Sequence, residues 1–566
     1  MSGSNCRGVL RRHAVAIILA ALTIVGLALR LWGIDQTDVV FGDEVPMVRI
    51  AMGFAATRSV IPVGGSIHPA GYPDVLLIAY GLYSVVGLLV GTFKSLEDVA
   101  FTYLVDPHAF YVIGRAIAAA EGAAVIYLTY RLGRRLANEK AGLIAAGVMT
   151  FAYVPFWFSH FALMESMLLL LSTGAFLASL HILTSPTRRM FAIAGALVGF
   201  AASTKYNGAP FILSLVAAHI IVSRREGKTW GRMPLGTNLW IGLGAALGGF
   251  LALSPFWVAD FPNRVADALS YFQIRSSGAW IGQTSNDIAL LSLVPQLIER
   301  EWTIGLLLLA GLGAALARRK ESDILALAAV APIFLMVGVM RSWSVHFLLP
   351  TYPVLAALGA AFLVRTLPRP AWLAGSVAVL VIAPAAANAI AADIQGLAED
   401  TRVVARRWIE TRIPPGEQVA LAYFWVGSCN PPVLGNGPQI WTLAKTYADD
   451  TFMARLPPGI SARLPGYFAS RPVYRIVFLE GFASPAELRS AGVRYAVTSS
   501  CAYATYLDKP PPPQGASWSE QYTKVRGLYQ ALLAQTPDIR VMAEFTSAQG
   551  YKGPDIRVID LSPGKK

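Results

Sequence analysis

The stretch AVAIILAALTIVGLALRLW occupies residues 14–32, and the sequence VVFGDEVP follows it at residues 39–46. The first stretch is strongly apolar and has the length that a helix needs to cross the hydrocarbon core of a membrane. Two adjacent carboxylates, Asp43 and Glu44, therefore lie just beyond the end of a membrane span. Adjacent acids repel each other unless a positive group compensates them, so their position at the membrane surface indicates a functional site.

The composition is that of an integral membrane protein. Of the 566 residues, 55% are hydrophobic and only 14% are charged, and the mean hydropathy is +0.51. A net charge of +13 is high enough to suggest binding to nucleic acid. The Arg and Lys residues cluster in short loops between apolar runs, however, as they do in the cytoplasmic loops of membrane proteins. This pattern argues against nucleic acid as a partner and indicates the lipid bilayer instead.

Three arginines, Arg7, Arg11 and Arg12, precede the first span. Because basic residues hold the end of a span in the cytoplasm, the sequence predicts a cytoplasmic N-terminus and places Asp43 on the outer side. A cleaved signal peptide is the alternative for a basic start followed by an apolar run. The run is long and no small-residue cleavage site follows it, so we interpret it as a retained anchor.

Five more clusters of basic residues set the direction of the later spans. All five lie in the cytoplasm if two spans separate each neighbouring pair. The clusters are Arg131, Arg134, Arg135 and Lys140; Arg188 and Arg189; Arg224, Arg225 and Lys228; Arg318, Arg319 and Lys320; and Arg365 and Arg369. The apolar stretches lie near 112–130, 141–158, 166–183, 190–204, 207–222, 237–255, 303–317, 323–340, 347–364 and 371–389. With the first span, they predict an all-α membrane bundle of about eleven helices, whose odd number puts the C-terminus outside.

The apolar segment from Val75 to Phe93 does not fit this scheme. It is long enough to span, but counting it inverts every later span and puts the cluster at Arg131 outside. We interpret it as a re-entrant segment or as a helix that lies along the membrane surface. An even number of spans remains the alternative.

The chain changes character over residues 391–566. Strand-like and helix-like segments alternate there, which predicts a small α/β domain on the outer side. The predicted strands lie at 418–423, 474–479, 494–498, 540–545 and 556–561, and the predicted helices at 400–410 and 519–534. Disulfides persist outside the cytoplasm, so Cys429 and Cys501 either form a bond or remain two buried thiols.

The predicted topology brings ionisable residues from different spans to the outer face. They are Asp43, Glu44, His68, Arg115, His160, Glu165, Lys205, Arg341 and His346. Such side chains are costly at membrane depth and usually face a bundle interior or a wet cavity, so we expect them to converge. Each also has an ordinary alternative. Arg115 and Lys205 can snorkel to the interface, Glu165 can cap the helix after it, and His160 and His346 can be hydrogen-bonded interface residues.

Carboxylates and cations together at a membrane surface suit group transfer. A carboxylate accepts a proton from an acceptor hydroxyl, while Arg and Lys stabilise the charge on a departing phosphate. A transporter or flippase of amphiphiles also uses buried acids, but usually near mid-membrane and within repeated halves, and this sequence has no internal repeat. A non-catalytic assembly subunit is the third hypothesis, and it alone tolerates the replacement of Asp43 by Asn.

The order of several short motifs resembles that of the C-type glycosyltransferases, above all the protein O-mannosyltransferases and the lipid A aminoarabinose transferases. The motifs are Asp43-Glu44, His68-Pro69-Ala70, the span that Arg115 opens and residues 130–136 end, Met164-Glu165-Ser166, Thr204-Lys205-Tyr206 and residues 346–353. In the tail, residues 492–500 and 553–558 look like the end of bacterial members.

The resemblance implies a transmembrane catalytic module of the C-type glycosyltransferase fold over residues 1–390, with a large first outer loop at 33–111. An extracytoplasmic α/β domain at 391–566 follows it. The implied activity is transfer of a monosaccharide, with inversion, from a polyprenyl-phosphate carrier to an acceptor outside the cytoplasmic membrane. The acceptor would be a protein, lipid A or a cell-surface glycan.

The resemblance also implies roles for residues of this sequence. Asp43 matches the first-loop Asp that serves as the family's catalytic base, and Glu44 stands beside it. Glu165 falls where many members carry Asp, so its longer side chain moves the carboxylate. Arg115 and Lys205 match basic positions near the donor phosphate.

Three further residues are expected to line the substrate pocket. His68 stands in the family's His-Pro-Pro motif, with Ala70 in place of the second Pro. His346 occupies a place where relatives often have Arg or Tyr, and Arg341 precedes it. A divalent metal would help to neutralise the phosphate, although no ligand spacing in the sequence requires one.

Overall fold

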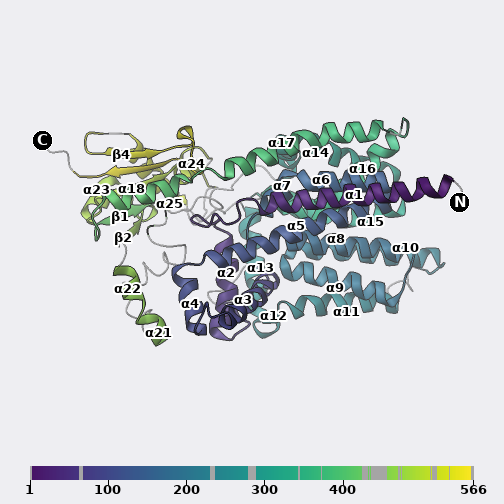
Figure 1. Ribbon diagram of the computed structural model, residues 1–566, viewed down its shortest axis with the longest axis horizontal. Coiled ribbons are helices and arrows are strands. Elements are labelled where there is room, and N and C mark those ends of the chain that lie inside the picture. Colours follow the sequence, from purple (N-terminus) through teal and green to yellow (C-terminus); the bar gives the residue numbers. More distant parts are fainter. Residues whose placement is uncertain are drawn as a thin grey trace.

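Long apolar helices run side by side through most of the molecule, and a small β-sheet lies beyond one end of them (Figure 1). This computed structural model describes residues 3–62, 68–229, 236–277, 289–341, 344–370, 372–422, 431–432, 434, 456–469, 472, 474–509, 511–512, 519–534 and 536–562. The arrangement confirms the predicted fold class, a membrane helical bundle followed by a domain with a sheet.

Eleven helices make up the bundle within the described residues (Figure 1). They are α1 (Gly3–Leu31), α5 (His108–Leu136), α6 (Glu139–Phe151), α8 (Glu165–Ile182), α9 (Arg188–Thr204), α10 (Ile212–Arg225), α11 (Thr237–Ala252), α14 (Ala289–Arg318), α15 (Glu321–Gly338), α16 (Tyr352–Thr366) and α17 (Leu373–Gly396). Short 3-10 helices, η1 (Tyr206–Phe211) and η3 (Val345–Thr351), lead into α10 and α16. The chain is therefore a multi-pass membrane protein.

Nine helices of the described part are long and apolar enough to cross a membrane, against about eleven predicted spans. Eight coincide with predicted spans, and the ninth is α3 (Gly71–Leu89). The remaining predicted spans correspond to α6, α9 and α11, which have only 13, 17 and 16 residues. The first of these is short because Ala152 leaves the helical conformation and the chain restarts as α7 (Tyr153–Phe158).

Several short helices gather at the end of the bundle that faces the sheet (Figure 1). They are α2 (Glu44–Thr57), α3, α4 (Leu96–Val105), α12 (Phe256–Ala259) and α13 (Phe261–Ser277). One side of α3 is buried against the protein through Tyr72 and Tyr80, whereas Leu82 and Leu89 on other sides are exposed. A helix at the end of the bundle with exposed apolar side chains favours the surface position, one of the two that the sequence left open for residues 75–93.

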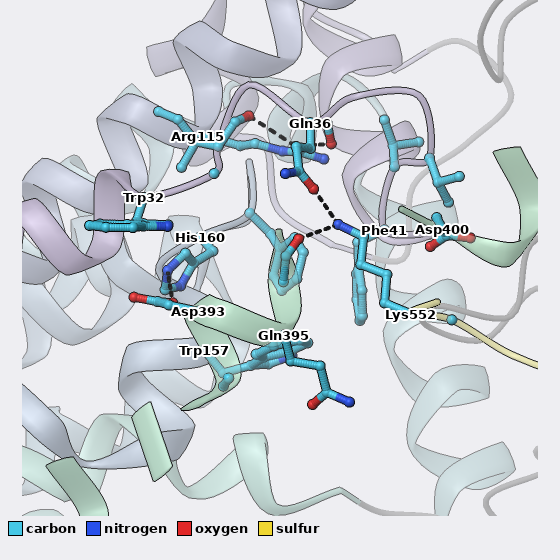
Figure 2. Close-up of a pocket in the computed structure, with 18 of the residues that line it drawn as sticks. Trp32, Gln36, Phe41, Arg115, Trp157, His160, Asp393, Gln395, Asp400 and Lys552 are labelled. Atoms are coloured by element: carbon cyan, nitrogen blue, oxygen red, sulfur yellow. Dashed lines mark hydrogen bonds and ion pairs between the residues drawn. The ribbon is translucent and has the colours of Figure 1, made fainter. Parts of the chain in front are cut away.

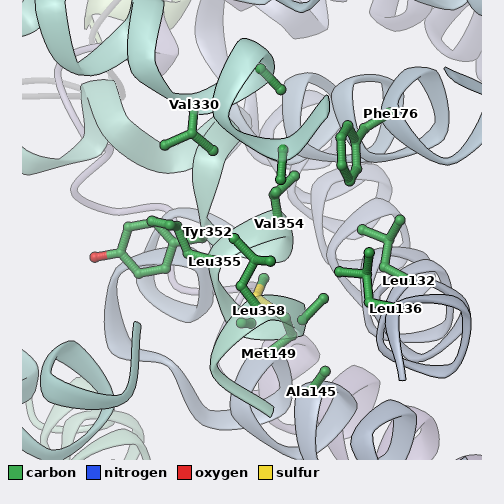
Figure 3. Close-up of a cluster of buried hydrophobic side chains, with 14 of the residues drawn as sticks. Leu132, Leu136, Ala145, Met149, Phe176, Val330, Tyr352, Val354, Leu355 and Leu358 are labelled. Atoms are coloured by element: carbon green, nitrogen blue, oxygen red, sulfur yellow. The ribbon is translucent and has the colours of Figure 1, made fainter. Parts of the chain in front are cut away.

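The hydrophobic core of the bundle is built around α16. In this helix and η3, 89% of the residues in the most apolar stretch are buried, against 11% in α1. Figure 3 shows Tyr352, Leu355 and Leu358 of α16 among side chains such as Met149 of α6 and Phe176 of α8. The central helix is thus enclosed by protein, and α1 has its apolar surface available to lipid.

Glycines let α9 and α11 pack backbone against backbone. A Cβ atom on Gly195 would lie 1.9 Å from the carbonyl oxygen of Gly242, and one on Gly199 would lie 2.1 Å from that of Ala246. Any larger side chain at either position would force the two helices apart. Such small residues one helical turn apart are typical of close helix packing in membranes.

The C-terminal region forms a five-stranded sheet in the order β2-β1-β3-β5-β4. The strands are β1 (Gln418–Leu421), β2 (Arg475–Phe478), β3 (Tyr495–Ser499), β4 (Arg540–Phe545) and β5 (Ile556–Asp560). β1 pairs in parallel with β2 and β3, and β5 is antiparallel to β3 and β4. These strands lie where the sequence predicted them, because alternating and apolar runs between turns identify strands well.

Helices complete the C-terminal region. They are α18 (Thr401–Arg412), α21 (Pro458–Ser461), α22 (Leu464–Ala469), α23 (Pro485–Ser490), α24 (Ser500–Leu507) and α25 (Ser519–Leu533), with the 3-10 helices η4 (Leu479–Gly481) and η5 (Ser547–Gln549). Two clusters of buried side chains form the core of this region, one that includes α25 and one that includes α18. Cys501 in α24 is disulfide-bonded. Cys429 lies outside the described residues, so its pairing with Cys501 stays a prediction.

Candidate active site

Asp43 lies in a tight turn between the first span and α2. The amide of Glu44 donates a hydrogen bond to the carbonyl of Phe41 at 2.9 Å, which closes the turn. Asp43 is the residue before the first turn of α2, and its side chain caps no backbone amide of that helix. The side chain is exposed, so its carboxylate remains reachable from outside the protein.

Glu44 points in the opposite direction, into the protein, and pairs with Arg115 of α5. The guanidinium donates from Nε and Nη2 to the two carboxylate oxygens, each at 2.8 Å. Arg115 Nη1 also donates to the carbonyls of Ile34 and Gln36. Glu44 accepts two further bonds, from the amides of Phe41 and Ala162. Both residues are buried, and each takes part in four hydrogen bonds within the protein. The pair therefore anchors the turn that carries Asp43.

These contacts revise the roles that the sequence suggested for Glu44 and Arg115. We expected a second catalytic carboxylate and a group that binds the donor phosphate. A fully buried carboxylate with four hydrogen bonds has no lone pair left to direct at a substrate, and four of the five N–H groups of Arg115 already donate to protein oxygens. We therefore assign both to the positioning of Asp43.

Glu165 and Lys205 form a second buried ion pair. Glu165 begins α8, and Lys205 follows the last residue of α9 in an extended conformation that turns the chain into η1. The Lys205 ammonium lies 2.8 Å from Oε1 of Glu165. Oε2 of Glu165 is buried and, among the described residues, has no hydrogen-bond partner. A buried carboxylate oxygen without a partner is costly, so this atom is available to a ligand.

Arg275, in the last turn of α13, joins this group of charges. Its guanidinium lies 5.3 Å from the centre of the Phe347 ring and 5.1 Å from that of Tyr271. The Lys205 ammonium lies 5.4 Å from the same Phe347 ring. One aromatic ring of η3 thus packs against both cations and holds them near each other despite their like charge.

Two histidines lie beside these cations. The ring of His68 packs edge-on against Tyr271, with 6.0 Å between centroids. His346 shares a hydrogen bond of 2.8 Å between Nδ1 and the Ser344 hydroxyl, and its ring packs against Phe158. Burial and, to a smaller extent, the positive charges of Lys205 and Arg275 together lower the pKa of His68 to about 3. His68 is therefore neutral at physiological pH and acts only as a neutral hydrogen-bonding group.

The same charges act on Asp43. Although the side chain of Asp43 reaches the surface, the protein around it disfavours the charged form, and together with the negative charge of Glu165 this raises the pKa of Asp43 from 3.8 to about 6. The positive charges of Lys205 and Arg275 oppose this shift. Four ionisable groups from α2, α8, α9 and α13 therefore lie within electrostatic reach of one another, as expected where a carboxylate takes part in proton transfer.

Two other residues of the predicted outer face make different contacts. His160 shares hydrogen bonds with backbone carbonyls of Phe156 and Leu29, and its Nε2 also lies 3.1 Å from Oδ1 of Asp393 in α17. It links three elements of the bundle. Arg341 has an exposed side chain, and only its backbone amide approaches the cluster, donating to the carbonyl of Arg275 at 3.0 Å. Its place in the substrate pocket stays a prediction.

A resident metal does not fit the residues of this cluster. Within the described part of the chain, no group of three or more His, Cys, Asp or Glu side chains lies close enough to hold one. The carboxylates that face the cluster are matched by Lys205 and Arg275 instead.

Arg275 is the functional candidate that the sequence reasoning missed. It lies in a segment between two spans for which the sequence predicts no helix. One signal was available, because an Arg in an outer loop departs from the preference of basic residues for the cytoplasmic side. Its partner Phe347 was visible only as one letter of the motif at residues 346–353.

The sequence pattern of the dolichyl-phosphate-mannose-protein mannosyltransferase family matches residues 100–258. This segment contains Arg115, Glu165 and Lys205, but not Asp43 or Arg275. No protein with a curated function matches the sequence.

Two solved membrane proteins have similar structures. ArnT from Cupriavidus metallidurans in the apo state superimposes with a TM-score of 0.51 at 15% identity, over 97% of this chain and 98% of that one. The archaeal oligosaccharyltransferase AglB from Archaeoglobus fulgidus, in complex with an inhibitory peptide and a dolichol-phosphate, gives a TM-score of 0.50 at 13% identity, over 94% of this chain and 80% of that one. At such identities the similarity concerns the fold, and at that level it confirms the resemblance that the order of motifs indicated.

Proposed function

Because the chain has the fold of the C-type glycosyltransferases, we propose that it is an integral-membrane glycosyltransferase. It takes a monosaccharide from a polyprenyl-phosphate carrier and transfers it to a hydroxyl group of an extracytoplasmic acceptor. The observation that carries this proposal is the exposed carboxylate of Asp43 beside two buried cations, Lys205 and Arg275. The dolichol-phosphate in the AglB complex supports a lipid phosphate as the donor's leaving group.

In this reaction Asp43 is the general base. It accepts the proton of the acceptor hydroxyl as that oxygen forms a bond to the anomeric carbon of the sugar. The bond between the anomeric carbon and the phosphate oxygen breaks at the same time, and the electron pair leaves with the polyprenyl phosphate. Attack from the face opposite the leaving group inverts the anomeric centre.

Lys205 and Arg275 stabilise the phosphate as its charge grows. Both cations are already desolvated and held against Phe347, so little reorganisation is needed when the transition state forms. Glu165 holds Lys205 in place through the contact of 2.8 Å and keeps a second oxygen for a sugar hydroxyl. His68 and His346 line the same region as neutral groups that can hydrogen-bond to the donor.

The proposed location is the cytoplasmic membrane, with the N-terminus inside and the C-terminal domain outside. The basic clusters at Arg134, Arg224 and Arg318 support this orientation, since Asp43 then lies at the opposite end of the bundle. The division at residue 390 into a catalytic module and an extracytoplasmic domain belongs to the same proposal.

Transfer should depend on pH through Asp43. A general base works only when deprotonated, so with a pKa of about 6 the rate should rise up to about pH 6 and level off above it. Below that value we expect a fall of about tenfold per pH unit. Initial rates in proteoliposomes between about pH 4.5 and 8, compared with protein kept at each pH and assayed at neutral pH, separate titration from unfolding. A rate that stays constant down to about pH 4.5 would show that this group does not act as the base.

Replacing Arg275 by Met should weaken the use of the donor. Loss of one preorganised charge at a developing anion lowers kcat about 10²-fold or more, and Lys205→Met should have an effect of the same order. The matched control is Arg49→Met, which removes an exposed charge of α2 and should leave kcat/KM within about threefold of the wild type. Equal losses in Arg275→Met and Arg49→Met would contradict the assignment of Arg275.

The function itself is tested with purified protein in liposomes. Radiolabelled polyprenyl-phosphate sugars are supplied with total envelope acceptors, and the label is followed into protein, lipid and glycan fractions. Appearance of free polyprenyl phosphate together with a labelled acceptor supports the proposal. Movement of the intact lipid-linked sugar across the bilayer without a covalent product favours a flippase, and inactivity with every donor favours an assembly subunit.

A further inference from the structure

A cavity of about 360 Å³ lies between the bundle and the C-terminal region, and neither Lys205 nor Arg275 lines it. Its walls come from the end of α1, the loop that leads to Asp43, α7, the end of α17, and residues 552–553 before β5. Figure 2 shows Trp32 and Trp157 on one side of this cavity and Lys552 with Gln36 on the other. No local sequence pattern predicts this cavity, because five separate segments of the chain build it.

Aromatic rings form much of the wall. Tyr153 and Trp157 of α7 stack with 5.9 Å between centroids and 18° between planes. Trp157 also packs edge-on against Phe161, and Trp32 lines the same cavity with half of its surface exposed. An aromatic face carries negative charge density that attracts the weakly positive C–H groups on the face of a sugar ring. Open aromatic faces inside a cavity therefore suit a saccharide.

A buried carboxylate faces the same space with one oxygen unused. Oδ1 of Asp393 lies 3.1 Å from Nε2 of His160, and Figure 2 shows this pair beside Trp32. Oδ2 of Asp393 has no hydrogen-bond partner among the described residues, although only 7% of the side chain is exposed. An unpaired buried acceptor costs free energy, so a ligand hydroxyl that donates a hydrogen bond to Oδ2 would remove that cost and strengthen binding.

Lys552 supplies a donor on the opposite side. Its ammonium donates to Oε1 of Gln36 and to the carbonyl of Gly396. An ammonium has three N–H groups, so one more remains for a ligand oxygen. The cavity thus offers a donor and an acceptor on facing walls, with aromatic rings between them.

Two of the three Arg and Lys side chains that line the cavity are paired with carboxylates. Arg402 is bound to Asp400 at 2.7 Å, and Arg115 is bound to Glu44. Lys552 is therefore the one cation of the described lining that has no carboxylate in direct contact. A phosphate requires more positive charge than this, as in the cluster of Lys205 and Arg275, so a neutral ligand rich in hydroxyl groups fits better.

We propose that this cavity binds a neutral saccharide, and that in the transferase of the proposed function it holds the acceptor. The binding itself does not depend on the reaction, whereas the role as acceptor site rests on the proposed function. The loop that ends at Phe41 lines the cavity and continues into the turn of Asp43 two residues later. A saccharide in the cavity therefore contacts the segment that carries the base.

Saccharide binding is measured directly, with saturation-transfer NMR on the full-length protein in nanodiscs. The probes are three neutral trisaccharides, built from mannose, glucose and galactose respectively. The wild type should transfer saturation to the ring protons of at least one probe. Trp157→Ala and Asp393→Asn should each weaken its binding about fivefold or more, since each removes a ring face or a charged acceptor. Trp372→Ala is the matched control, because that tryptophan is exposed and lies outside the cavity.

Two variants of the proposed catalytic residues test saccharide binding independently of sugar transfer. Asp43→Asn and Arg275→Met should bind the trisaccharide as the wild type does, even if no donor supports transfer. Absence of saturation transfer to every probe in folded wild type overturns the proposal, as does binding as tight as that of the wild type in both Asp393→Asn and Trp157→Ala. Displacement of the trisaccharide by a polyprenyl phosphate in the Arg275→Met variant would assign the cavity to the donor and would also overturn it.

The saccharide can come from a free glycan or from the headgroup of a glycolipid. Nanodiscs that contain a monoglucosyl diacylglycerol should displace the trisaccharide if a headgroup enters from the membrane side, where Trp32 ends the first span. Nanodiscs with phosphatidylglycerol are the control. If the trisaccharide is displaced in nanodiscs with the glycolipid but not in those with phosphatidylglycerol, the natural ligand is a lipid headgroup. If it stays bound in both kinds of nanodisc, the ligand is a soluble glycan.

Discussion

The variant Asp43→Asn should transfer sugar about 10²- to 10⁴-fold more slowly than the wild type, the range that a positioned general base contributes. The substitution keeps the size of the side chain and removes its ability to take a proton. Donor binding should survive, because Lys205 and Arg275 remain in place against Phe347. The loss should therefore appear in kcat with little change in the dissociation constant of the donor.

Asp38→Asn is the matched control for this prediction. Asp38 lies in the same loop and makes one long contact of 3.4 Å with Arg406 of α18, with 63% of its side chain exposed. Its replacement should change the rate by less than about threefold. Asp43→Glu keeps an acid but moves it by a methylene, and should retain part of the activity. Wild-type rates in Asp43→Asn would exclude this residue as the base and would favour the assembly-subunit hypothesis.

Replacing Glu44 by Gln should destabilise the fold by about 3–5 kcal/mol, because it leaves the guanidinium of Arg115 buried without a counter-charge. The contacts at 2.8 Å join α2 to α5, and the amide of Ala162 also bonds to this carboxylate. Activity should fall as well, since the turn that carries Asp43 loses its anchor. Unfolding in detergent, followed by temperature or denaturant, measures the first effect, and the transfer assay measures the second.

A double variant and a surface pair make this prediction specific. Glu44→Gln combined with Arg115→Met removes both charges, so it should recover much of the stability that Glu44→Gln loses. The exposed pair of Arg225 and Glu321 is the control, since Glu321→Gln should cost less than about 1 kcal/mol. If the double variant is as unstable as the sum of its single variants, the two residues do not act as a pair.

Much of the architecture could be predicted because its causes are local. A span is recognised from one apolar stretch, since a helix satisfies its own backbone hydrogen bonds in lipid. The strands of the C-terminal sheet were found in the same way, from short alternating runs between turns. The predicted number of spans is larger than the number of long helices in the structure, because some helices end early. Helix α6, for example, is broken at Ala152, near its outer end. An apolar stretch does not reveal such a break.

The candidate site was only partly predictable. Asp43, Glu165, Lys205 and His346 could be named, because ionisable residues at the ends of spans are rare enough to stand out. Adjacent residues of a turn cannot be told apart in this way. Glu44 and Asp43 have the same chemistry in the sequence, and only the position of Arg115 on α5 shows which of the two is buried.

The sequence by itself determined the membrane environment, the approximate number and position of the spans, the sheet at the end of the chain and the presence of acids and bases on one face. Each of these depends on composition or on a short periodic pattern. Only the tertiary structure decided that Glu44 anchors the turn, that Arg275 joins Lys205 on the ring of Phe347, and that Trp157 and Asp393 face a common cavity. The physical reason is that these contacts join segments far apart in the chain, and their geometry depends on how whole helices pack against one another.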